Sequence, residues 1–349
     1  MEYRQCGYTD LKLSVIGTGC WAFGGGEYWG PNDQSDTNAV VRAAVEAGIN
    51  YFDTAEAYNE GRSERSLGEA IRDIPRDKVL LGSKISPSHC YPDLLERHCE
   101  ASLKRLGTDY LDLYMIHWPI HPHSIRHFTK DESVINHPPL LEEALARMET
   151  LKQKGMIREL GISNFSRARM QDIPAKIRIA ANELPYNLLC RAIEFDTLPH
   201  CQKKGVGIIG YMTLLQGILT GLYRSLEEVP EWQRRTRHFR AAGSPLSRHG
   251  EDGFEEQTEK ARTAVRMIAG EEGISLASLA TRWVLANPAI TCALIGARNT
   301  RKLEENIAAA EGRLSTDTLN RLDKVTDKLK NKMDAHFDYY ESTQNDRTL

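Results

Sequence analysis

The chain has 349 residues, 41% of them hydrophobic, which is enough to bury a large core without disulfide bonds. Its 45 basic and 48 acidic residues nearly cancel, and this balance excludes a strong electrostatic attraction to nucleic acid or to an anionic membrane. No stretch is apolar enough for a signal peptide or a membrane span, and the seven cysteines lack the CxxC spacing of zinc sites. We therefore expect a reduced, soluble protein of the cytoplasm.

Short apolar runs alternate with amphipathic stretches along the chain. A hairpin is predicted over residues 3–14, and eight strands are predicted at 15–19, 49–54, 78–84, 111–117, 157–164, 179–184, 206–211 and 290–296. Between them, apolar residues recur at helical spacing, as at Leu145, Met148 and Leu151. Strands that alternate with helices indicate a parallel sheet, and eight such units predict an α/β fold, the (β/α)8 TIM barrel. Residues 1–349 are expected to form one barrel domain whose lower end the hairpin closes.

Three segments interrupt this rhythm. They are 119–139, rich in His and Pro; 222–260, which is charged; and the tail after about residue 333. Because the first two follow strands, they are predicted to be loops on the C-terminal face of the barrel. Such long loops are usually functional or disordered. The tail is expected either to be flexible or to cover the site.

Ionisable residues stand where three successive strands are predicted to end. Asp53 ends the second strand, Lys84 the third and His117 the fourth, and Tyr58 follows Asp53 in the next loop. In this fold, catalytic residues come from the C-terminal ends of different strands. Taken alone, each is more simply a helix cap, a rim lysine or a core histidine. All four in register predict one catalytic site.

These four side chains suit the reduction of a carbonyl group. The ammonium group of Lys84 is expected to lower the pKa of the Tyr58 hydroxyl by about three units, or roughly 4 kcal/mol, which one charge pair supplies near 4 Å. Asp53 would keep Lys84 charged, and His117 would donate a second hydrogen bond to the substrate oxygen. A proton donor beside a carbonyl oxygen suits reduction of an aldehyde or ketone by hydride from a cofactor.

Five motifs in order resemble the signatures of the aldo-keto reductase family: "DTAEAY" (53–58), "GSK" (82–84), "DLYMIHWP" (112–119), "GISNF" (161–165) and "ENIAA" (305–309). The resemblance covers about residues 3–330 and points to bacterial members related to the potassium-channel β-subunit branch. It implies a tetrad of Asp53, Tyr58, Lys84 and His117, with Tyr58 as general acid in reduction and general base in oxidation. It also implies NADP as the usual cofactor, with NAD as the alternative, bound without a Rossmann domain.

The stretch "GTGCWA" (17–22) matches the dinucleotide fingerprint GxGxxG/A. A Rossmann turn leads straight into a helix, whereas the glycines and proline of "FGGGEYWGPND" disfavour one here. We therefore reject the Rossmann interpretation. The family resemblance instead implies that Gly19, Cys20 and Trp21 lie beside the cofactor and the substrate.

The resemblance implies further cofactor contacts. Ser163 and Asn164 are expected to bind the nicotinamide carboxamide, and Tyr211 is expected to stack on its ring. The residues expected along the pyrophosphate and the adenosine are Leu215, Gly217, Leu219, Gly296, Arg298, Lys302, Glu305 and Asn306. Of these, Arg298 and Lys302 are predicted to bind the 2′-phosphate of NADP where the last helix begins; the alternative is a pair of solvated cations.

Glu183, in "NELPYN", departs from the family pattern, which commonly has Gln there. A glutamate still accepts a hydrogen bond from the carboxamide, but its charge beside a nicotinium ring favours the oxidised cofactor. The preferred direction of the reaction therefore stays open.

The stretch "HWPIHPHSIRHF" contains His121, His123 and His127. No cysteine or acidic residue stands at ligand spacing, and Pro119 and Pro122 break a helical face, so no metal site is predicted. The histidines are expected to line a pocket of sugar or glycoside size or to lie in solvent.

Aromatic residues are expected to form the walls of the substrate pocket: Trp21, Tyr28, Trp29 and Trp118. The expected partner is a small carbonyl or alcohol, and the sequence leaves the oligomeric state open. One alternative function is a regulatory subunit that binds the cofactor with little turnover. Another is a barrel isomerase or aldolase, which needs a Schiff-base lysine or an enolising glutamate and fits the four residues less well.

Overall fold

The structure is a computed structural model that describes residues 1–349. Eight parallel strands form a closed barrel, in which each strand pairs with the next and the last pairs with the first. They are β3 (Ile16–Gly19), β4 (Tyr51–Asp53), β5 (Leu80–Ile85), β6 (Leu111–Ile116), β7 (Ile157–Ser163), β8 (Ala181–Pro185), β9 (Gly207–Tyr211) and β10 (Ile290–Ile295). The predicted TIM barrel and its eight strands are confirmed, with ends that differ by at most two residues.

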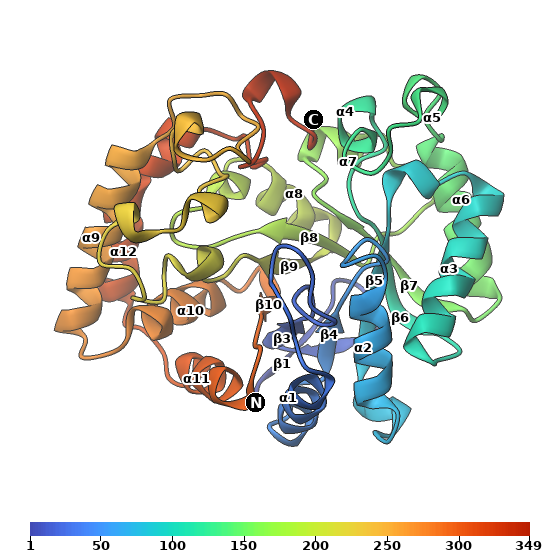
Figure 1. Cartoon of the computed structure of the whole chain (residues 1–349), viewed down its shortest axis with the longest axis horizontal. Helices are drawn as coiled ribbons and strands as arrows, with labels where there is room; N and C mark the ends of the chain where they lie inside the picture. The colour runs from blue at the N-terminus through green and yellow to red at the C-terminus, as the bar shows by residue number, and fades with distance from the viewer.

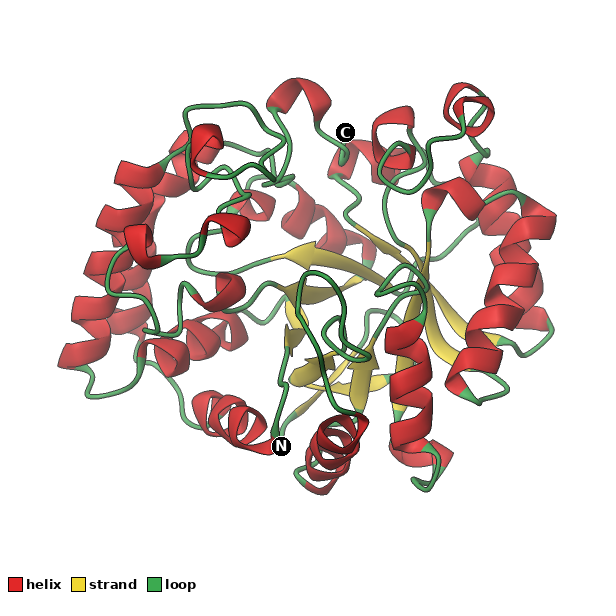
Figure 2. Ribbon diagram, in the orientation of Figure 1, coloured by secondary structure: helices red, strands yellow, loops and turns green.

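Helices surround the barrel (Figure 1 and Figure 2). They are α1 (Gln34–Glu46), α2 (Arg62–Ile71), α3 (Pro92–Leu106), α4 (Pro122–Ile125), α5 (Glu132–Asn136), α6 (Leu141–Gln153), α7 (Arg167–Gln171), α8 (Thr197–Lys204), α9 (Glu255–Glu271), α10 (Leu276–Ala286), α11 (Thr300–Ala310) and α12 (Thr316–Met333). The apolar stripe read in the sequence is the buried face of α6, where Leu145, Met148 and Leu151 are fully buried. None of the helices is both long and apolar enough to cross a membrane.

The hairpin closes the N-terminal end of the barrel, as predicted. Its strands, β1 (Tyr3–Gln5) and β2 (Lys12–Ser14), pair antiparallel. Between them, Cys6 and Leu11 are buried in one apolar cluster with barrel residues such as Met115 and Ile209. The hairpin thus seals this end, and the opposite, C-terminal end carries the long loops.

The long loops differ in detail from the prediction. Segment 119–139 contains α4 and α5, and the charged segment ends at residue 254 because α9 begins at Glu255. The tail after Met333 lies over both loops: the Ser124 hydroxyl donates to the Arg347 carbonyl oxygen, and the Arg237 backbone N–H donates to that of Tyr339. Figure 1 shows the C-terminus at the loop end of the molecule, near α4 and α7.

Candidate active site

Four ionisable side chains meet at the C-terminal end of the barrel. Lys84 Nζ lies 2.5 Å from Asp53 Oδ2 and 3.2 Å from the Tyr58 hydroxyl oxygen. The Tyr58 and His117 rings lie edge to face, with centroids 5.5 Å apart. Lys84 is fully buried, Asp53 and His117 are buried, and Tyr58 is half-buried. The structure therefore brings together the four residues that the strand ends singled out.

The barrel fixes three of these residues and a turn fixes the fourth. The parallel register places Gly82 of β5 beside Asp53, and His117 immediately follows β6, where its backbone N–H donates to the Ile85 carbonyl oxygen. Tyr58 stands in a turn tied to the neighbouring loop, because the Asn59 side chain donates to the Trp21 carbonyl oxygen at 2.8 Å. Rigid strand ends thus carry Asp53, Lys84 and His117, and a braced loop carries Tyr58.

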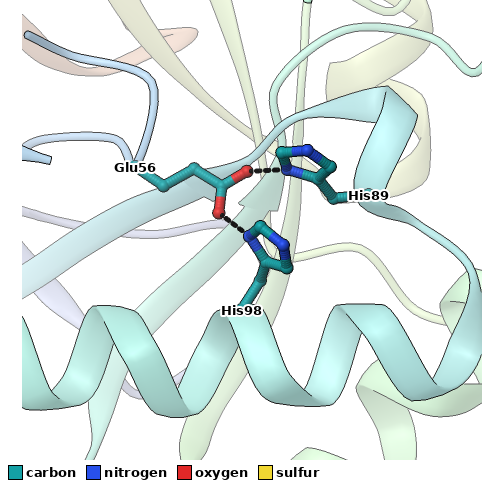
Figure 3. Close-up of side chains that lie close together, drawn as sticks. All are labelled: Glu56, His89 and His98. Atoms are coloured by element: carbon teal, nitrogen blue, oxygen red, sulfur yellow. Dashed lines mark hydrogen bonds and ion pairs between the residues drawn. The ribbon is translucent and has the colours of Figure 1, made fainter. Parts of the chain in front are cut away.

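A second polar cluster, which the sequence reasoning missed, braces the same loop. The Glu56 carboxylate lies 2.8 Å from His89 Nδ1 and 2.6 Å from His98 Nδ1 (Figure 3). It also accepts the backbone N–H of Ser86 at 2.9 Å. Burial alone would raise the pKa of Glu56, but the hydrogen bonds from His89 and His98 hold that pKa far below its usual range. One carboxylate oxygen of Glu56 and one ring nitrogen each of His89 and His98 lie within 4.8 Å of one another, as the ligands of a metal ion would. Here hydrogen bonds to the Glu56 carboxylate hold both rings.

The electrostatics of Tyr58 differ from the sequence prediction. Burial raises the pKa of the Tyr58 hydroxyl above its ordinary value of about 10, despite the opposing charge of Lys84. The carboxyl groups of Asp53 and Glu183 raise it further. The predicted lowering of the Tyr58 pKa is therefore wrong. The prediction considered only the charge of Lys84, and not the burial of Tyr58 or the nearby acids Asp53 and Glu183. Tyr58 is a neutral phenol at neutral pH.

Glu183 joins the buried charges instead of standing apart from them. Its Oε1 lies 3.4 Å from Lys84 Nζ, and its Oε2 is buried without a hydrogen-bond partner. Burial, together with the adjacent Asp53, holds the pKa of Glu183 well above its usual range. Asp53 makes the shorter contact with Lys84, although burial raises the pKa of Asp53 as well, against the opposing charge of Lys84. Although burial lowers the pKa of Lys84, the charges of Asp53 and Glu183 outweigh that effect and raise it.

His117 is a neutral imidazole. Burial and the charge of Lys84 hold its pKa well below its usual range. Its Nδ1 is buried without a hydrogen-bond partner. A neutral ring carries one N–H and one acceptor nitrogen, so His117 is able to donate a hydrogen bond without adding charge to the site.

The residues predicted to bind the nicotinamide form one hydrogen-bonded group at the ends of β7, β8 and β9. The Tyr211 hydroxyl donates to Asn164 Oδ1 at 2.7 Å, and Asn164 Nδ2 donates to the His117 carbonyl oxygen at 3.1 Å. The Ser163 hydroxyl donates to the Glu183 carbonyl oxygen at 3.2 Å. Asn164 adopts a φ of 64°, a conformation that few residues other than glycine take. The group is thus held in one place next to His117.

The residues predicted to line the pyrophosphate lie in a strained turn after β9. Leu215 and Leu219 are buried in the core, and the turn between them has φ values of 44° at Leu215, 52° at Gln216 and 99° at Gly217. With both leucine side chains pointing into the core, the backbone of this turn is what remains for a ligand.

Two glycines leave space between neighbouring strand ends. A Cβ added to Gly19 at the end of β3 would lie 3.9 Å from the backbone nitrogen of Gly296, which follows β10. One added to Gly296 would lie 3.6 Å from the Gly19 carbonyl oxygen. Cys20 is buried beside them and its backbone N–H donates to the Asp53 carbonyl oxygen at 2.8 Å. Side chains at these glycines would occupy the space between the two strand ends, in contact with the opposite backbone.

The predicted adenosine-end residues lie at α11, which α12 follows, so α11 is not the last helix as expected. Arg298 is exposed and donates to the Pro31 carbonyl oxygen at 2.5 Å, whereas Lys302 pairs with Glu305 at 2.6 Å. The side chain of Asn306 donates to the Gly296 carbonyl oxygen. Both cations stand at the same rim, but Lys302 must release Glu305 to bind a phosphate.

An aromatic wall stands beside Tyr58. The Trp21 ring lies 6.0 Å from the Tyr58 ring, stacks on Tyr28 at 5.0 Å and meets Trp29 edge-on at 5.2 Å. Trp232, which the sequence reasoning did not select, packs edge-on against Tyr28 at 4.9 Å. Trp118 instead lies under the guanidinium of Arg347 at 3.8 Å. The tail thus covers part of the predicted pocket wall.

The histidines of segment 119–139 do not converge on one point. The His121 and His123 rings meet edge-on at 4.9 Å, and the His121 side chain accepts the His123 backbone N–H. His127 Nε2 lies 3.2 Å from Glu341 of the tail. The contact between His127 and Glu341 joins the loop to the tail.

Comparison with known proteins places this geometry in a family. A family model described as "Aldo/keto reductase family" matches residues 15–327. Aldo-keto reductase YhdN of Bacillus subtilis is 32% identical over 319 residues, 87% of each chain, and methylglyoxal reductase YeaE of Escherichia coli is 30% identical over 90% of this chain and 92% of its own.

Solved structures agree with the sequence comparison. An aldo-keto reductase from Klebsiella pneumoniae in complex with NADPH matches with a TM-score of 0.70 and 27% identity, over 99% of this chain and 98% of its own. A glycerol dehydrogenase from Gluconobacter oxydans matches with a TM-score of 0.75 and 26% identity, over 93% of this chain and 95% of its own. The chain belongs to the aldo/keto reductase family.

Proposed function

We propose that the protein is an NADP-dependent oxidoreductase that interconverts an aldehyde or ketone and the corresponding alcohol. The observation that carries this proposal is the buried contact of Lys84 Nζ with both the Tyr58 hydroxyl and Asp53, with His117 beside them. The NADPH complex of the Klebsiella relative and the name of the methylglyoxal reductase support the cofactor and the reaction class.

In reduction, Tyr58 is the proton donor. NADPH held by these residues would supply the hydride that the carbonyl carbon accepts. Tyr58 and His117 donate hydrogen bonds to the carbonyl oxygen and so stabilise the negative charge that develops there. The Tyr58 proton passes to this oxygen, because an alkoxide is a much stronger base than a phenolate. The resulting phenolate lies 3.2 Å from Lys84 Nζ, whose positive charge stabilises it until solvent returns the proton.

The residues at these strand ends fit a nicotinamide dinucleotide. Asn164 and Tyr211 offer amide and hydroxyl groups next to His117, and the paired glycines Gly19 and Gly296 leave room for an extended molecule. We assign Ser163, Asn164 and Tyr211 to the nicotinamide end. Leu215, Gly217 and Leu219 line the pyrophosphate, and Arg298, Lys302, Glu305 and Asn306 the adenosine.

The test is turnover with NADPH in both directions. Aldehydes such as methylglyoxal, ketones, sugars and glycosides are offered in turn, and the absorbance of reduced nicotinamide is followed. We expect steady oxidation of NADPH with at least one aldehyde. Tight NADPH binding without turnover of any compound would instead favour a regulatory subunit, and absence of both would overturn the proposal.

Cofactor choice gives a first prediction. A charge-assisted hydrogen bond to a 2′-phosphate contributes roughly 1.5–3 kcal/mol, so Arg298→Ala is expected to raise KM for NADPH about tenfold or more. KM for NADH should stay within about twofold, because NADH has no phosphate there. Lys302→Ala should also raise KM for NADPH, but by a smaller factor. Lys302 has to break its ion pair with Glu305 before it binds the phosphate, and this cost offsets part of the gain. Equal kcat/KM for both cofactors in the unmodified protein would contradict the prediction.

Glu183 gives a second prediction, on the pH dependence of stability. Its pKa is raised in the folded state, so the folded protein holds a proton that the unfolded chain releases above about pH 4.3. Stability contributed by this proton is present below that pH and is lost as the pH rises toward the folded-state pKa. Glu183→Gln has nearly the same side-chain shape but no ionisable group. The Tm of Glu183→Gln minus that of the wild type should therefore increase with pH, and parallel Tm curves would refute the assignment.

A further inference from the structure

Two buried donor groups beside the active site have no acceptor within the protein. The Nε of Arg235 and the Nε1 of Trp29 are both buried without a hydrogen-bond partner. They come from loops far apart in the sequence and meet at Tyr28. The Arg235 guanidinium lies 4.3 Å from the Tyr28 ring centroid, and the Trp29 ring centroid lies 4.7 Å from it. Buried donors without an acceptor are rare and costly in native proteins, so two at one place need an explanation.

Arg235 differs from the other arginines of its segment. Arg234 donates to two backbone carbonyl oxygens, and Arg237 and Arg240 each pair with a glutamate, although the Nη1 of Arg237 also lacks a partner. Arg235 belongs to no ion pair, and it lies over the rings of Tyr28 and Tyr340. Its charge is therefore not neutralised by the protein. An arginine keeps this charge at any ordinary pH and offers a planar set of N–H groups suited to carboxylates and phosphates.

The place of these donors connects them to the reacting groups. The Tyr28 ring stacks on Trp21 with an interplanar angle of 7°, and Trp21 is the ring beside Tyr58. Arg235 thus stands two aromatic layers away from Tyr58. On its other side, the Tyr28 hydroxyl donates to Gln216, in the turn assigned to the pyrophosphate. Tyr28 therefore links the wall beside Tyr58 to this turn, and both donors adjoin Tyr28.

We propose that Arg235 and Trp29 form an anion-binding site at the entrance of the active site, where they hold a carboxylate or phosphate group. This inference rests on the proposed function, because Tyr58 defines the reacting end. Two molecules bring such a group. One is an anionic substrate whose carboxylate or phosphate stands several bonds away from its carbonyl. The other is the cofactor itself, through its pyrophosphate.

The test separates the two sources with matched probes. The probes are 4-carboxybenzaldehyde, its uncharged methyl ester and NADPH, whose binding is followed by fluorescence without turnover. Arg235→Met removes the charge, and Trp29→Phe removes only the N–H. Arg240→Met is the matched control, because Arg240 lies in the same segment, is largely exposed and pairs with Glu255.

If the substrate supplies the anion, Arg235→Met should lower kcat/KM for 4-carboxybenzaldehyde by about ten- to hundredfold, the loss of one charge-assisted hydrogen bond. Values for the ester, and the Kd for NADPH, should stay within about twofold. If the pyrophosphate supplies it, the Kd for NADPH should rise by a similar factor and both aldehydes should be affected alike. Trp29→Phe should follow the same pattern with a smaller change.

The site is overturned if Arg235→Met and Trp29→Phe change neither NADPH binding nor the ratio of the two aldehydes by more than Arg240→Met does. That result together with an inactive Tyr58→Phe variant would remove the anion site and leave the proposed function standing. A fully active Tyr58→Phe variant would overturn the catalytic role of Tyr58. The Kd for NADPH of Arg235→Met would then still decide whether Arg235 binds the pyrophosphate.

Discussion

Tyr58→Phe is expected to lower kcat for aldehyde reduction by about 10² to 10⁴, the usual contribution of a positioned general acid. The reason is that the phenol is the group with a transferable proton beside the site where the alkoxide forms, whereas His117 is a neutral hydrogen-bond donor. The Kd for NADPH should change by less than about twofold, because the variant removes one oxygen atom and keeps the ring.

The matched control for this variant is Tyr114→Phe. The Tyr114 hydroxyl is also buried and has no hydrogen-bond partner, but it lies outside the catalytic cluster. Steady-state rates and NADPH fluorescence titrations are compared for both variants. Turnover of Tyr58→Phe at the level of Tyr114→Phe would remove Tyr58 from the mechanism.

Lys84→Met is expected to damage both catalysis and stability. Loss of the ammonium group removes the charge that stabilises the phenolate, so kcat should fall by about 10² or more. It also leaves Asp53 buried without its cation. Removing one partner of a buried ion pair destabilises a protein by about 3–5 kcal/mol. Because Asp53 is then forced to bind a proton, the loss of stability should grow as the pH rises.

Lys152→Met is the control for the stability effect. Lys152 is partly exposed and forms an ion pair with Glu159, which also accepts a hydrogen bond from the Tyr8 hydroxyl, so the loss of Lys152 should cost less than about 1 kcal/mol. Chemical unfolding of both variants across a pH series gives the comparison. Equal unfolding free energies for Lys84→Met and the wild type would mean that Asp53 has another partner.

The fold and the four central residues were predictable from the sequence because both depend on local patterns. Short apolar runs that alternate with stretches of helical periodicity predict a barrel. The C-terminal ends of its parallel strands then bring Asp53, Lys84 and His117 to one rim. The direction of the Tyr58 pKa was not predictable, because it depends on how much solvent the surrounding loops exclude and on Glu183, which follows Lys84 by almost a hundred residues.

The contacts that the sequence reasoning missed join residues far apart in the chain. Glu56 meets His98 across a strand and a loop, and His127 meets Glu341 of the tail. No spacing rule signals such pairs, since each residue alone looks like a surface side chain. Arg235 carries no signal in the sequence for a related reason: whether an arginine has a partner is decided by the packing of three loops.

Transfer of deuterium from labelled cofactor is the most direct measurement of the central claim. The protein is incubated with NADPH carrying deuterium at the transferable C4 position and with an aldehyde that it reduces, and the alcohol is analysed by mass spectrometry. We expect one deuterium on the carbinol carbon with the wild type, and labelled product slowed by about 10² or more with Tyr58→Phe. Alcohol formed without the label, or labelled product formed equally fast without the Tyr58 hydroxyl, would contradict hydride transfer assisted by this tyrosine.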